Sequence, residues 1–537
     1  MEPSSKKVFL REATGLVRTV SPFATIVTTI VLTNYGLGMA TFVPFTPYLY
    51  PGVDLGVSIA IFAIPFVVAN ALLYILFTRA MPRAGGDQVW ISRVVSPYIS
   101  VGFLFLWVLY QAIFWGSLTN YTISYFLGSG FATMGFALHN AALTASSSFF
   151  STPAAIIGLG TIIIAVITAA LFVPLRTMIK YLIGLWALGM VAILISVALF
   201  VGATHTGFVN TFNADFASYN VTYNGIISQA SNSGFTNPGL VFLGIPTLFA
   251  TAFLFLSLNG FQMGAYFAGE LKSVNRSMLV AGIGGGLVSI FFYGLVGGTF
   301  QSVVGAKFVN AIAYVFNAQP ASYKLPIPWN NFLFSMLLTN NPVLIVIEVI
   351  GLFAWGIAGL IAIGLVGSRI MLAAGFDRTL PSKLGYVSPR FHTPVVTVLI
   401  FAILTEIGLV FSTYAGIVFS FLNITLVLVA LYAFVGFTAA IFPYRKKQMY
   451  QLSPISKYKV AGIPAISIVG LVNLVLFAAL FYFSLLNPAV SGPTGLPAIL
   501  TLIGIFVAGV IAHGITRYYY RGKGIDIKLA TSEIPPE

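Results

Sequence analysis

The sequence has no cysteine and few charged residues. Without cysteine, disulfide bonds, thiolate metal ligands and a cysteine nucleophile are excluded. Charged side chains make up only 7% of the 537 residues, whereas soluble domains carry roughly 25%. Hydrophobic residues make up 58%, which is more apolar surface than a water-soluble core could bury. The composition therefore predicts an integral membrane protein.

Apolar runs long enough to cross a bilayer recur along the whole chain. A hydrocarbon layer roughly 30 Å thick needs about 20 helical residues. We predict twelve helices in a single membrane domain, residues 22–518, between an N-terminal tail (1–21) and a C-terminal tail (519–537). The predicted helices are 22–45, 55–79, 97–127, 152–173, 177–202, 240–268, 277–303, 342–373, 393–411, 414–441, 461–486 and 495–518.

The basic residues fall almost entirely in alternate loops. The net charge of +14 would suggest nucleic-acid binding in a soluble chain. Here, however, all but two of the 26 Lys and Arg residues lie in the tails or in every second loop, the exceptions being Lys307 and Lys324. Cytoplasmic loops of membrane proteins carry such an excess. We therefore expect a multi-pass protein of the cell membrane, embedded in the lipid bilayer, with both termini in the cytoplasm and no nucleic-acid partner.

Two long loops interrupt the pattern of short connections. Residues 202–239 and 304–341 are polar, aromatic and nearly uncharged, and the charge pattern places both outside the cell. The second loop is predicted to form an external lid with helical pieces around Ala311 and Phe332.

The first and sixth helices each contain a polar stretch with glycine near the middle. In the first helix it runs from Thr33 to Gly38, and in the sixth from Ser257 to Gln262. Glycine weakens a helix, and lipid offers the freed backbone groups no partner. Interrupted helices at matching places in two halves indicate the substrate site of a secondary transporter. Close helix packing is the alternative explanation for such glycines.

Interrupted helices can bind both charges of an amino acid. A half-helix that begins at the break points free N–H groups at an anion, and a half-helix that ends there points carbonyl groups at a cation. Neither break contains an acidic or basic side chain. The pattern therefore favours a neutral or hydrophobic amino acid as substrate.

Three ordered motifs resemble those of the amino acid-polyamine-organocation superfamily of permeases. The first follows the second helix and runs from Met81 to Arg93, MPRAGGDQVWISR. The second comprises Gly260-Phe261-Gln262, Ala268 to Lys272 and Asn275-Arg276. The third comprises Ser368-Arg369, Ala373 to Asp377, Leu380-Pro381 and Thr393 to Val395. Each motif stands at the loop where the family has its counterpart.

The resemblance implies the all-α leucine-transporter fold. Helices 1–5 (22–202) and 6–10 (240–441) would be inverted repeats, followed by helices 11 and 12 (461–518), with substrate between helices 1 and 6. Backbone N–H groups of residues 36–38 would bind the substrate carboxylate, and carbonyl groups of residues 256–259 its ammonium group. The substrate-binding residues implied are Asn34, Tyr35, Gly36, Leu37 and Gly38 in helix 1, and Leu256, Ser257, Asn259, Gly260 and Gln262 in helix 6.

The chain departs from the family at functional positions of helix 6. Gln262 stands where several members have a glutamate, and a neutral amide cannot titrate. Leu256 stands where some members have a gating tryptophan. The neighbouring Phe255 and Phe261 are therefore the candidates for closing the pocket by their bulk.

The coupling ion is left open by these comparisons. Residues 359–367 lack the hydroxyl that sodium-coupled relatives place against helix 1, which disfavours sodium at that site. Gly189 stands where a proton-coupled relative has a lysine. Only Glu348 and Glu406 lie inside predicted helices, where a carboxyl group is costly. Glu348, on the helix that lines the site, is a possible site for H+ as coupling ion, whereas Glu406 is expected to be a structural or interfacial partner.

Four charged residues are predicted at the cytoplasmic face. An ion-pair lock that holds this face closed would suit them, and plain membrane anchoring is the alternative. They are Asp87, Arg93, Glu270 and Arg369.

The leading functional hypothesis is a secondary active carrier of amino acids that works by alternating access, either proton-coupled or as an exchanger. A carrier of another small amine or a nucleobase could use the same breaks. A membrane enzyme would need a metal, a nucleophile–base pair or a carboxylate dyad, and a channel a repeated filter; the sequence shows none of these. We expect no cofactor and no metal, because the four histidines lack ligand spacing.

Overall fold

The computed structural model is built almost entirely from helices and describes Leu16, Thr531 and residues 18–415, 417–486 and 496–527. Eleven helical segments in this part of the chain are long and apolar enough to cross a membrane, and α14 (Ile245–Ser257) is apolar but shorter. Each of the twelve predicted helices has a counterpart among them. The all-α membrane architecture predicted from the sequence is therefore confirmed.

The first half of the chain folds as a series of helices joined by short turns. Its helices are α1 (Pro22–Thr33), α2 (Tyr35–Leu37), α3 (Val43–Leu49), α4 (Leu55–Val57), α5 (Ala63–Ala80), α6 (Asp87–Val94), α7 (Pro97–Tyr121), α8 (Gly130–Ala137), α9 (Ala141–Ser146), α10 (Pro153–Leu171) and α11 (Leu175–Gly202). Wider helical turns, η1 (Gly38–Phe42), η2 (Ser58–Phe62) and η3 (Thr122–Ser129), continue several of them without a gap.

The second half adds a β-hairpin to the same helical pattern. Its helices are α12 (His205–Asp215), α13 (Tyr223–Asn232), α14, η6 (Met263–Tyr266), η7 (Ala268–Glu270), α15 (Val274–Leu279), η8 (Val280–Gly285), α16 (Gly286–Val304), α17 (Ala306–Ala318), α18 (Asn331–Met336), α19 (Pro342–Phe376), α20 (Val395–Ala415), α21 (Ile417–Arg445), α22 (Lys447–Leu452), α23 (Ala465–Leu486) and α25 (Leu496–Gly522). The hairpin pairs β1 (Lys459–Val460) with β2 (Ile463–Pro464).

Four membrane helices begin with the same two-residue signal. A side chain accepts a hydrogen bond from a backbone N–H of the first turn, and proline follows as the first helical residue. The cap satisfies a donor that would otherwise lack a partner, and proline has the φ that a helix start requires. The pairs are Ser21-Pro22, Ser96-Pro97, Thr152-Pro153 and Asn341-Pro342.

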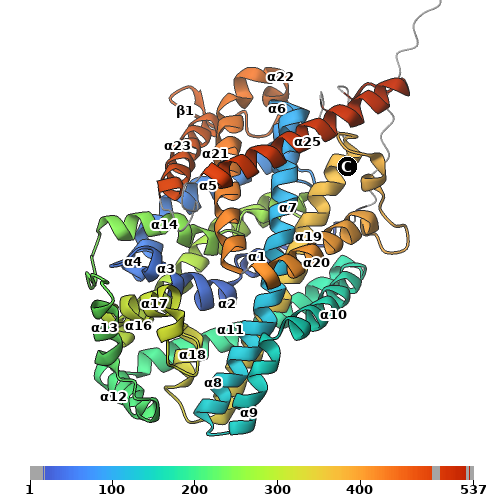
Figure 1. Cartoon of the computed structure of the whole chain (residues 1–537). Coiled ribbons are helices and arrows are strands. Elements are labelled where there is room, and N and C mark those ends of the chain that lie inside the picture. The colour runs from blue at the N-terminus through green and yellow to red at the C-terminus, as the bar shows by residue number, and fades with distance from the viewer. Residues whose placement is uncertain (1–15, 17, 416, 487–495, 528–530, 532–537) are drawn as a thin grey trace, which may run out of the picture.

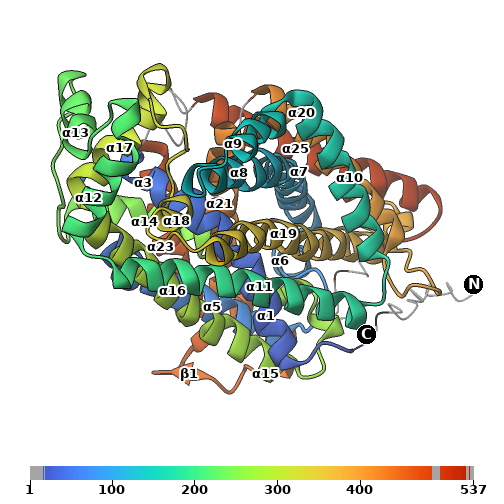
Figure 2. The same ribbon diagram turned by 90° about the horizontal axis from the view of Figure 1, so that it is seen from below.

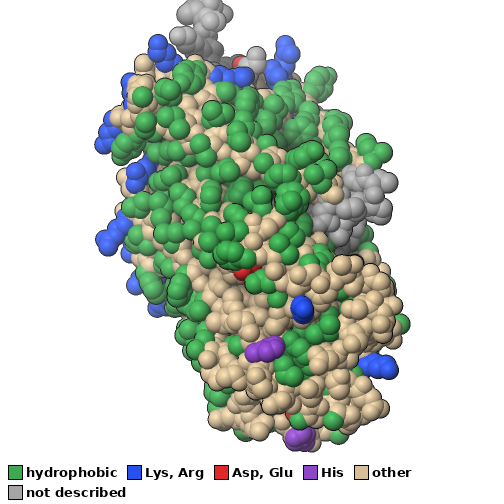
Figure 3. All heavy atoms as spheres, turned by 90° about the vertical axis from the view of Figure 1, so that its left-hand side faces the viewer, with side chains coloured by type: hydrophobic (Ala, Val, Ile, Leu, Met, Phe, Trp, Pro, Cys, Tyr) green, Lys and Arg blue, Asp and Glu red, His purple; other side chains and the backbone are tan. Residues whose placement is uncertain are grey.

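The two ends of the molecule differ in charge. The long helices α7 and α19 run between these ends in Figure 1. One end, which we call the basic face, holds α6, α22 and the segments 79–93, 369–390 and 445–459, which together contain 12 of the 26 basic residues. The other end, the neutral face, is formed by α12, α13, α17 and α18, which lie together in Figures 1 and 2. Figure 3 shows the same contrast, with Lys and Arg gathered along the upper and left edges of the view.

The neutral face is more helical than the sequence suggested. Ala311 lies in α17 and Phe332 in α18, as predicted for the second long loop. The first long loop also contains two helices, α12 and α13, which we did not predict. The signal for α12 was the spacing of Phe208 and Phe212, both buried, one turn apart in an otherwise polar segment.

Candidate functional site

The first membrane helix is interrupted at Asn34, as predicted. This residue has a left-handed backbone (φ +45°) and separates α1 from α2. Its Oδ1 accepts a hydrogen bond from the Leu37 N–H at 3.2 Å, and its carbonyl accepts one from the Gly38 N–H at 2.9 Å. The N–H groups of Tyr35 and Gly36 have no acceptor in the described part of the chain. The helical segment that starts after the break therefore begins with two free donors.

Aromatic side chains enclose this break. A Cβ added to Gly36 would overlap the side chain of Trp355 in α19, and one added to Gly38 would overlap the hydroxyl group of Tyr293 in α16. The Tyr35 ring lies 5.2 Å from that of Tyr293 and 5.5 Å from that of Trp355, between ring centroids. Glycine is thus required at positions 36 and 38 so that these rings can approach the backbone.

The end of α1 is capped from the side by α16. The hydroxyl group of Tyr293 lies 3.3 Å from the carbonyl oxygens of both Thr33 and Asn34 and donates to them. The hydroxyl group of Tyr35 is hydrogen-bonded to Ser289, also in α16, at 2.8 Å. Carbonyl groups that the break releases are in this way satisfied within the protein.

The second break lies directly against the first. Helix α14 ends at Ser257, and a short irregular turn separates it from η6. A Cβ on Gly260 would overlap the backbone of Leu32 and Thr33, so glycine allows direct backbone contact between the two interrupted segments. The structure therefore brings together the two stretches that the sequence singled out independently.

The polar side chains of the second break form a closed network. Gln262 is fully buried, and its Nε2 donates to Asn259 Oδ1 and to the hydroxyl group of Tyr432 in α21, both at 2.6 Å. The Tyr432 hydroxyl group also donates to Asn259 Oδ1. We did not predict Tyr432; the available signal was a tyrosine in the interior of the apolar tenth helix. Gln262 and Asn259 are thus oriented by α21.

The two candidate gating phenylalanines lie on different sides of this break. The Phe255 ring packs against Phe477 of α23 and Tyr432, with ring centroids 5.1 and 6.3 Å apart. Phe261 is buried against Gly286 of α16. Of the remaining helix 6 candidates, Ser257 is buried, whereas the side chain of Leu256 lies outside the described part of the structure.

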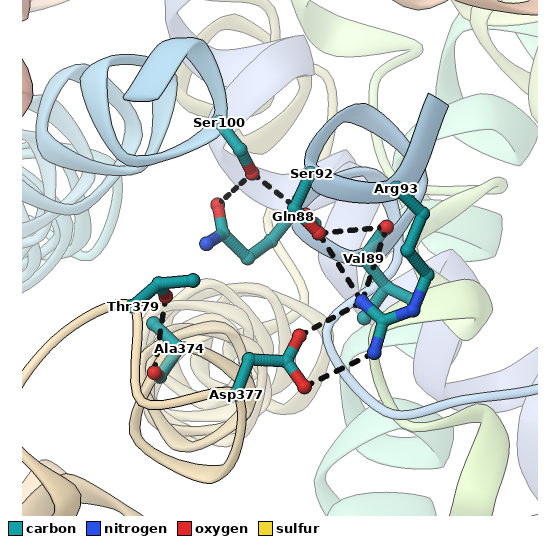
Figure 4. A network of polar contacts seen from close by, with 8 residues as sticks. All are labelled: Gln88, Val89, Ser92, Arg93, Ser100, Ala374, Asp377 and Thr379. Carbon is teal, nitrogen blue, oxygen red and sulfur yellow. Dashed lines mark hydrogen bonds and ion pairs between the residues drawn. The ribbon is translucent and has the colours of Figure 1, made fainter. Parts of the chain in front are cut away.

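Two bidentate ion pairs hold the basic face together. Arg369 of α19 donates through Nη2 and Nε to Glu270 at 3.0 and 3.1 Å. Arg93 of α6 donates through Nη1 and Nη2 to Asp377, which follows α19, at 2.8 and 3.0 Å (Figure 4). All four side chains are buried. Arg93, Glu270 and Arg369, three of the four residues predicted for an ion-pair lock, thus take part in ion pairs, and Asp377 is a partner that we did not predict.

Asp87 differs from our expectation. It is buried at the start of α6, yet it forms no ion pair with any described residue. Its Oδ2 instead accepts hydrogen bonds from the hydroxyl groups of Tyr266, at 2.6 Å, and Tyr74, at 3.0 Å. Of the four residues predicted for an ion-pair lock, Asp87 is thus the one without an ionic partner in the described chain, and Arg93 pairs with Asp377 instead, because α6 presents Arg93 to the end of α19.

Further hydrogen bonds, from side chains and from the backbone, join the segments around these ion pairs. Arg93 Nη1 also reaches Ser92 Oγ at 3.1 Å, and Ser100 of α7 donates to the carbonyl group of Gln88 at 2.6 Å (Figure 4). The N–H groups of residues 19 and 20 donate to the Glu270 carbonyl, and the Gly85 N–H donates to the Tyr266 carbonyl at 2.9 Å. The segment that follows the second break is therefore tied to the start of α1 and to the turn before α6.

Glu348 lies buried near the opposite end of α19. Its Oε1 accepts a hydrogen bond from Ser335 of α18 at 2.7 Å, and Ser335 in turn accepts one from Ser196 of α11 at 2.9 Å. Its Oε2 is buried without a hydrogen-bond partner among the described residues. The other intramembrane acid, Glu406, accepts a hydrogen bond from Thr161 of α10 at 2.6 Å and so joins two peripheral helices.

The side of the first break that faces α11 is filled by an indole ring. A Cβ on Gly189 of α11 would overlap the Trp355 ring, which also packs against Gly36. Within the described part of the chain, no three His, Asp or Glu side chains gather closely enough to hold a metal ion.

The comparisons with known proteins agree with this arrangement. The chain matches the family model described as amino acid permease over residues 18–508, which is nearly its whole length. No curated protein matches the sequence. With adjoining interrupted helices inside a multi-pass helical membrane domain, the chain belongs to the amino acid permease family of the amino acid-polyamine-organocation superfamily.

Proposed function

We propose that this permease is a secondary active carrier of neutral and hydrophobic amino acids that works by alternating access around the two breaks. The observation that carries the proposal is the contact between the Asn34 break, with its free N–H groups, and the Gly260 turn. Residues 22–202 and 240–441 are the two inverted repeats that move against each other, and the basic face is cytoplasmic.

The proposed site binds the substrate mainly through backbone groups. The free N–H groups of Tyr35 and Gly36 receive the substrate carboxylate, and the carbonyl groups at the end of α14 receive its ammonium group. The resemblance implied the N–H groups of residues 36–38 as donors to the carboxylate. Those of Leu37 and Gly38 already have acceptors, so the donors we propose are Tyr35 and Gly36. Rings of Tyr35, Tyr293 and Trp355 surround the break and favour an apolar substrate side chain.

The coupling ion we propose is the proton, with Glu348 as its site on the neutral side. The carboxyl group is buried, has one oxygen without a partner and contacts two helices besides its own through Ser335 and Ser196. Sodium is disfavoured at the helix 1 break, because residues 359–367 offer no hydroxyl group there.

The decisive experiment is a thermal-shift panel on the purified protein. Amino acids, small amines and nucleobases are each added at pH 5.5 and 7.5, with and without sodium. We expect neutral, apolar amino acids to raise the Tm and sodium to have no effect. The Glu348→Gln variant should bind the same amino acids with less dependence on pH. Stabilisation by an amine or a nucleobase alone would instead favour the second candidate, a carrier of that substrate class.

A further inference from the structure

Asp87 is a buried carboxyl group that the ion pairs of the basic face leave without a cation. The two arginines of these ion pairs are already engaged, Arg93 by Asp377 and Arg369 by Glu270, each through two hydrogen bonds. The partners of the Asp87 carboxyl group are two tyrosine hydroxyl groups and the backbone N–H of Gln88, all of which are neutral donors. An anion buried without a counter-ion is costly, and a proton removes that cost.

The donors to Asp87 come from the parts that close the basic face. Tyr74 lies on α5, and Tyr266 lies on η6, just after the second break. Next to Asp87, the Gly85 N–H donates to the Tyr266 carbonyl, and Ala84 pairs with Phe267 as an isolated β-bridge. Opening of this face must separate residues 84–87 from residues 266–267, and water would then reach the carboxyl group.

We propose that Asp87 is a proton-binding site whose protonated form holds the basic face closed. Among the residues that the structure describes, its titratable neighbours with an electrostatic effect are three tyrosines: Tyr74 from α5, Tyr266 from η6 and Tyr432 from α21. Beyond these, α7 and α19 direct no charged group of the described chain at it. The direction in which this face opens, to the cytoplasm, rests on the function proposed above; the linkage between proton and closure does not.

Burial also sets the pH range of the effect. Asp87 lies between membrane spans, and its burial raises the pKa from 3.8 to about 6, while the bonds from Tyr266 and Tyr74 lower the pKa in part. In the open state, water returns the pKa towards its ordinary value. Closure is therefore favoured by proton binding below pH 6, and this contribution is lost as the pH rises through about 6. Between pH 7.5 and pH 5 the closing equilibrium should shift about tenfold.

The absence of cysteine makes this shift measurable with one introduced thiol. Ala84→Cys places a thiol at the bridge to Phe267, where a hydrophilic maleimide can react only after opening. Lys457→Cys, in the exposed turn before β1, corrects for the reactivity of the thiol itself at each pH. The labelling rate of Ala84→Cys divided by that of Lys457→Cys then reports the open fraction in the full-length protein.

We expect this ratio to fall about tenfold from pH 7.5 to pH 5, and to stay constant when Asp87→Asn is added. Glu406→Gln, which removes a carboxyl group from a peripheral helix, is the matched control and should keep the full pH dependence. A ratio that does not change with pH in Ala84→Cys alone, or one that changes equally with Asp87→Asn, would overturn the proposal.

A second variant protects the test if Asp87→Asn does not fold. Tyr266→Phe removes the shorter hydrogen bond to the anion, so the midpoint of the pH dependence should move to higher pH. An unchanged midpoint would contradict the proposal. If the panel of amino acids shows no binding while the labelling ratio still depends on Asp87, the proposed transport function fails and the proton site stands.

Discussion

At the scale of single residues, the candidate site depends on three glycines, which have no Cβ atom. Gly36, Gly38 and Gly260 each lie where a Cβ would overlap a neighbour: an indole ring, a phenol and a backbone. Their loss of helix propensity is offset by close packing and, at Gly38, by the approach of the Tyr293 hydroxyl group to the carbonyl groups of Thr33 and Asn34. Asn34 complements them, because its short side chain tolerates the left-handed backbone and caps the next helical turn.

Replacement of Gly36 by alanine tests this directly. The added methyl group must displace Trp355 or the backbone beside it, so we expect a loss of about 1–3 kcal/mol in stability and of substrate-dependent stabilisation. The thermal-shift assay measures both. Gly184→Ala is the matched control, because no atom lies within 4 Å of its Cβ and alanine is the better helix former. Normal substrate binding by Gly36→Ala would show that the ring contact is dispensable.

At the scale of elements, the charged pairs of the basic face determine which helices stay together. Each arginine forms two parallel bonds to its carboxylate, which fixes direction as well as distance. Glu270 also accepts two backbone N–H bonds at its carbonyl from residues 19 and 20. The pair with Arg369 thus joins the start of α1, the segment after α14, and α19.

Removal of one partner should cost more than removal of both. Glu270→Gln leaves the buried Arg369 without its counter-ion, for which we expect a loss of about 3–5 kcal/mol. The double variant Glu270→Gln/Arg369→Met should recover much of this loss, because no uncompensated charge is left. Chemical denaturation of the four proteins of this double-mutant cycle measures the difference. Additive losses would show that the two side chains do not act as a pair.

The sequence was more informative about elements than about their partners. The apolar runs predicted the eleven described helical segments that are long enough to cross a membrane and the shorter α14, and the glycine stretches predicted the break at Asn34 and its neighbour at Gly260. Tertiary contacts could not be predicted in the same way. The sequence places both Asp87 and Asp377 in loops on the same side of the membrane as Arg93, so it does not say which of them pairs with Arg93. Only the approach of α6 to the end of α19 selects Asp377. Tyr432 stands out as a tyrosine inside an apolar helix, but its partners Gln262 and Asn259 follow only from the tertiary structure.

At the scale of the whole molecule, the two faces predict the orientation in the membrane. Basic loops are retained in the cytoplasm, so the neutral face should be extracellular. In intact cells, a membrane-impermeant maleimide should label Ser231→Cys in α13 and not Lys457→Cys, since both positions are exposed but lie on opposite faces. Permeabilised cells, in which both should react, provide the control. The opposite labelling pattern would invert the proposed topology.

One helix touches both of these faces. Helix α19 has 35 residues, so it is about 52 Å long. It carries Glu348 near one end and the partners of Glu270 and Arg93 near the other. If α19 tilts as a rigid body, a rotation of only about 5° around its middle moves each end by about 2 Å in opposite directions. That displacement exceeds the tolerance of a bidentate ion pair, so we expect a movement at one end of α19 to break the ion pairs at the other.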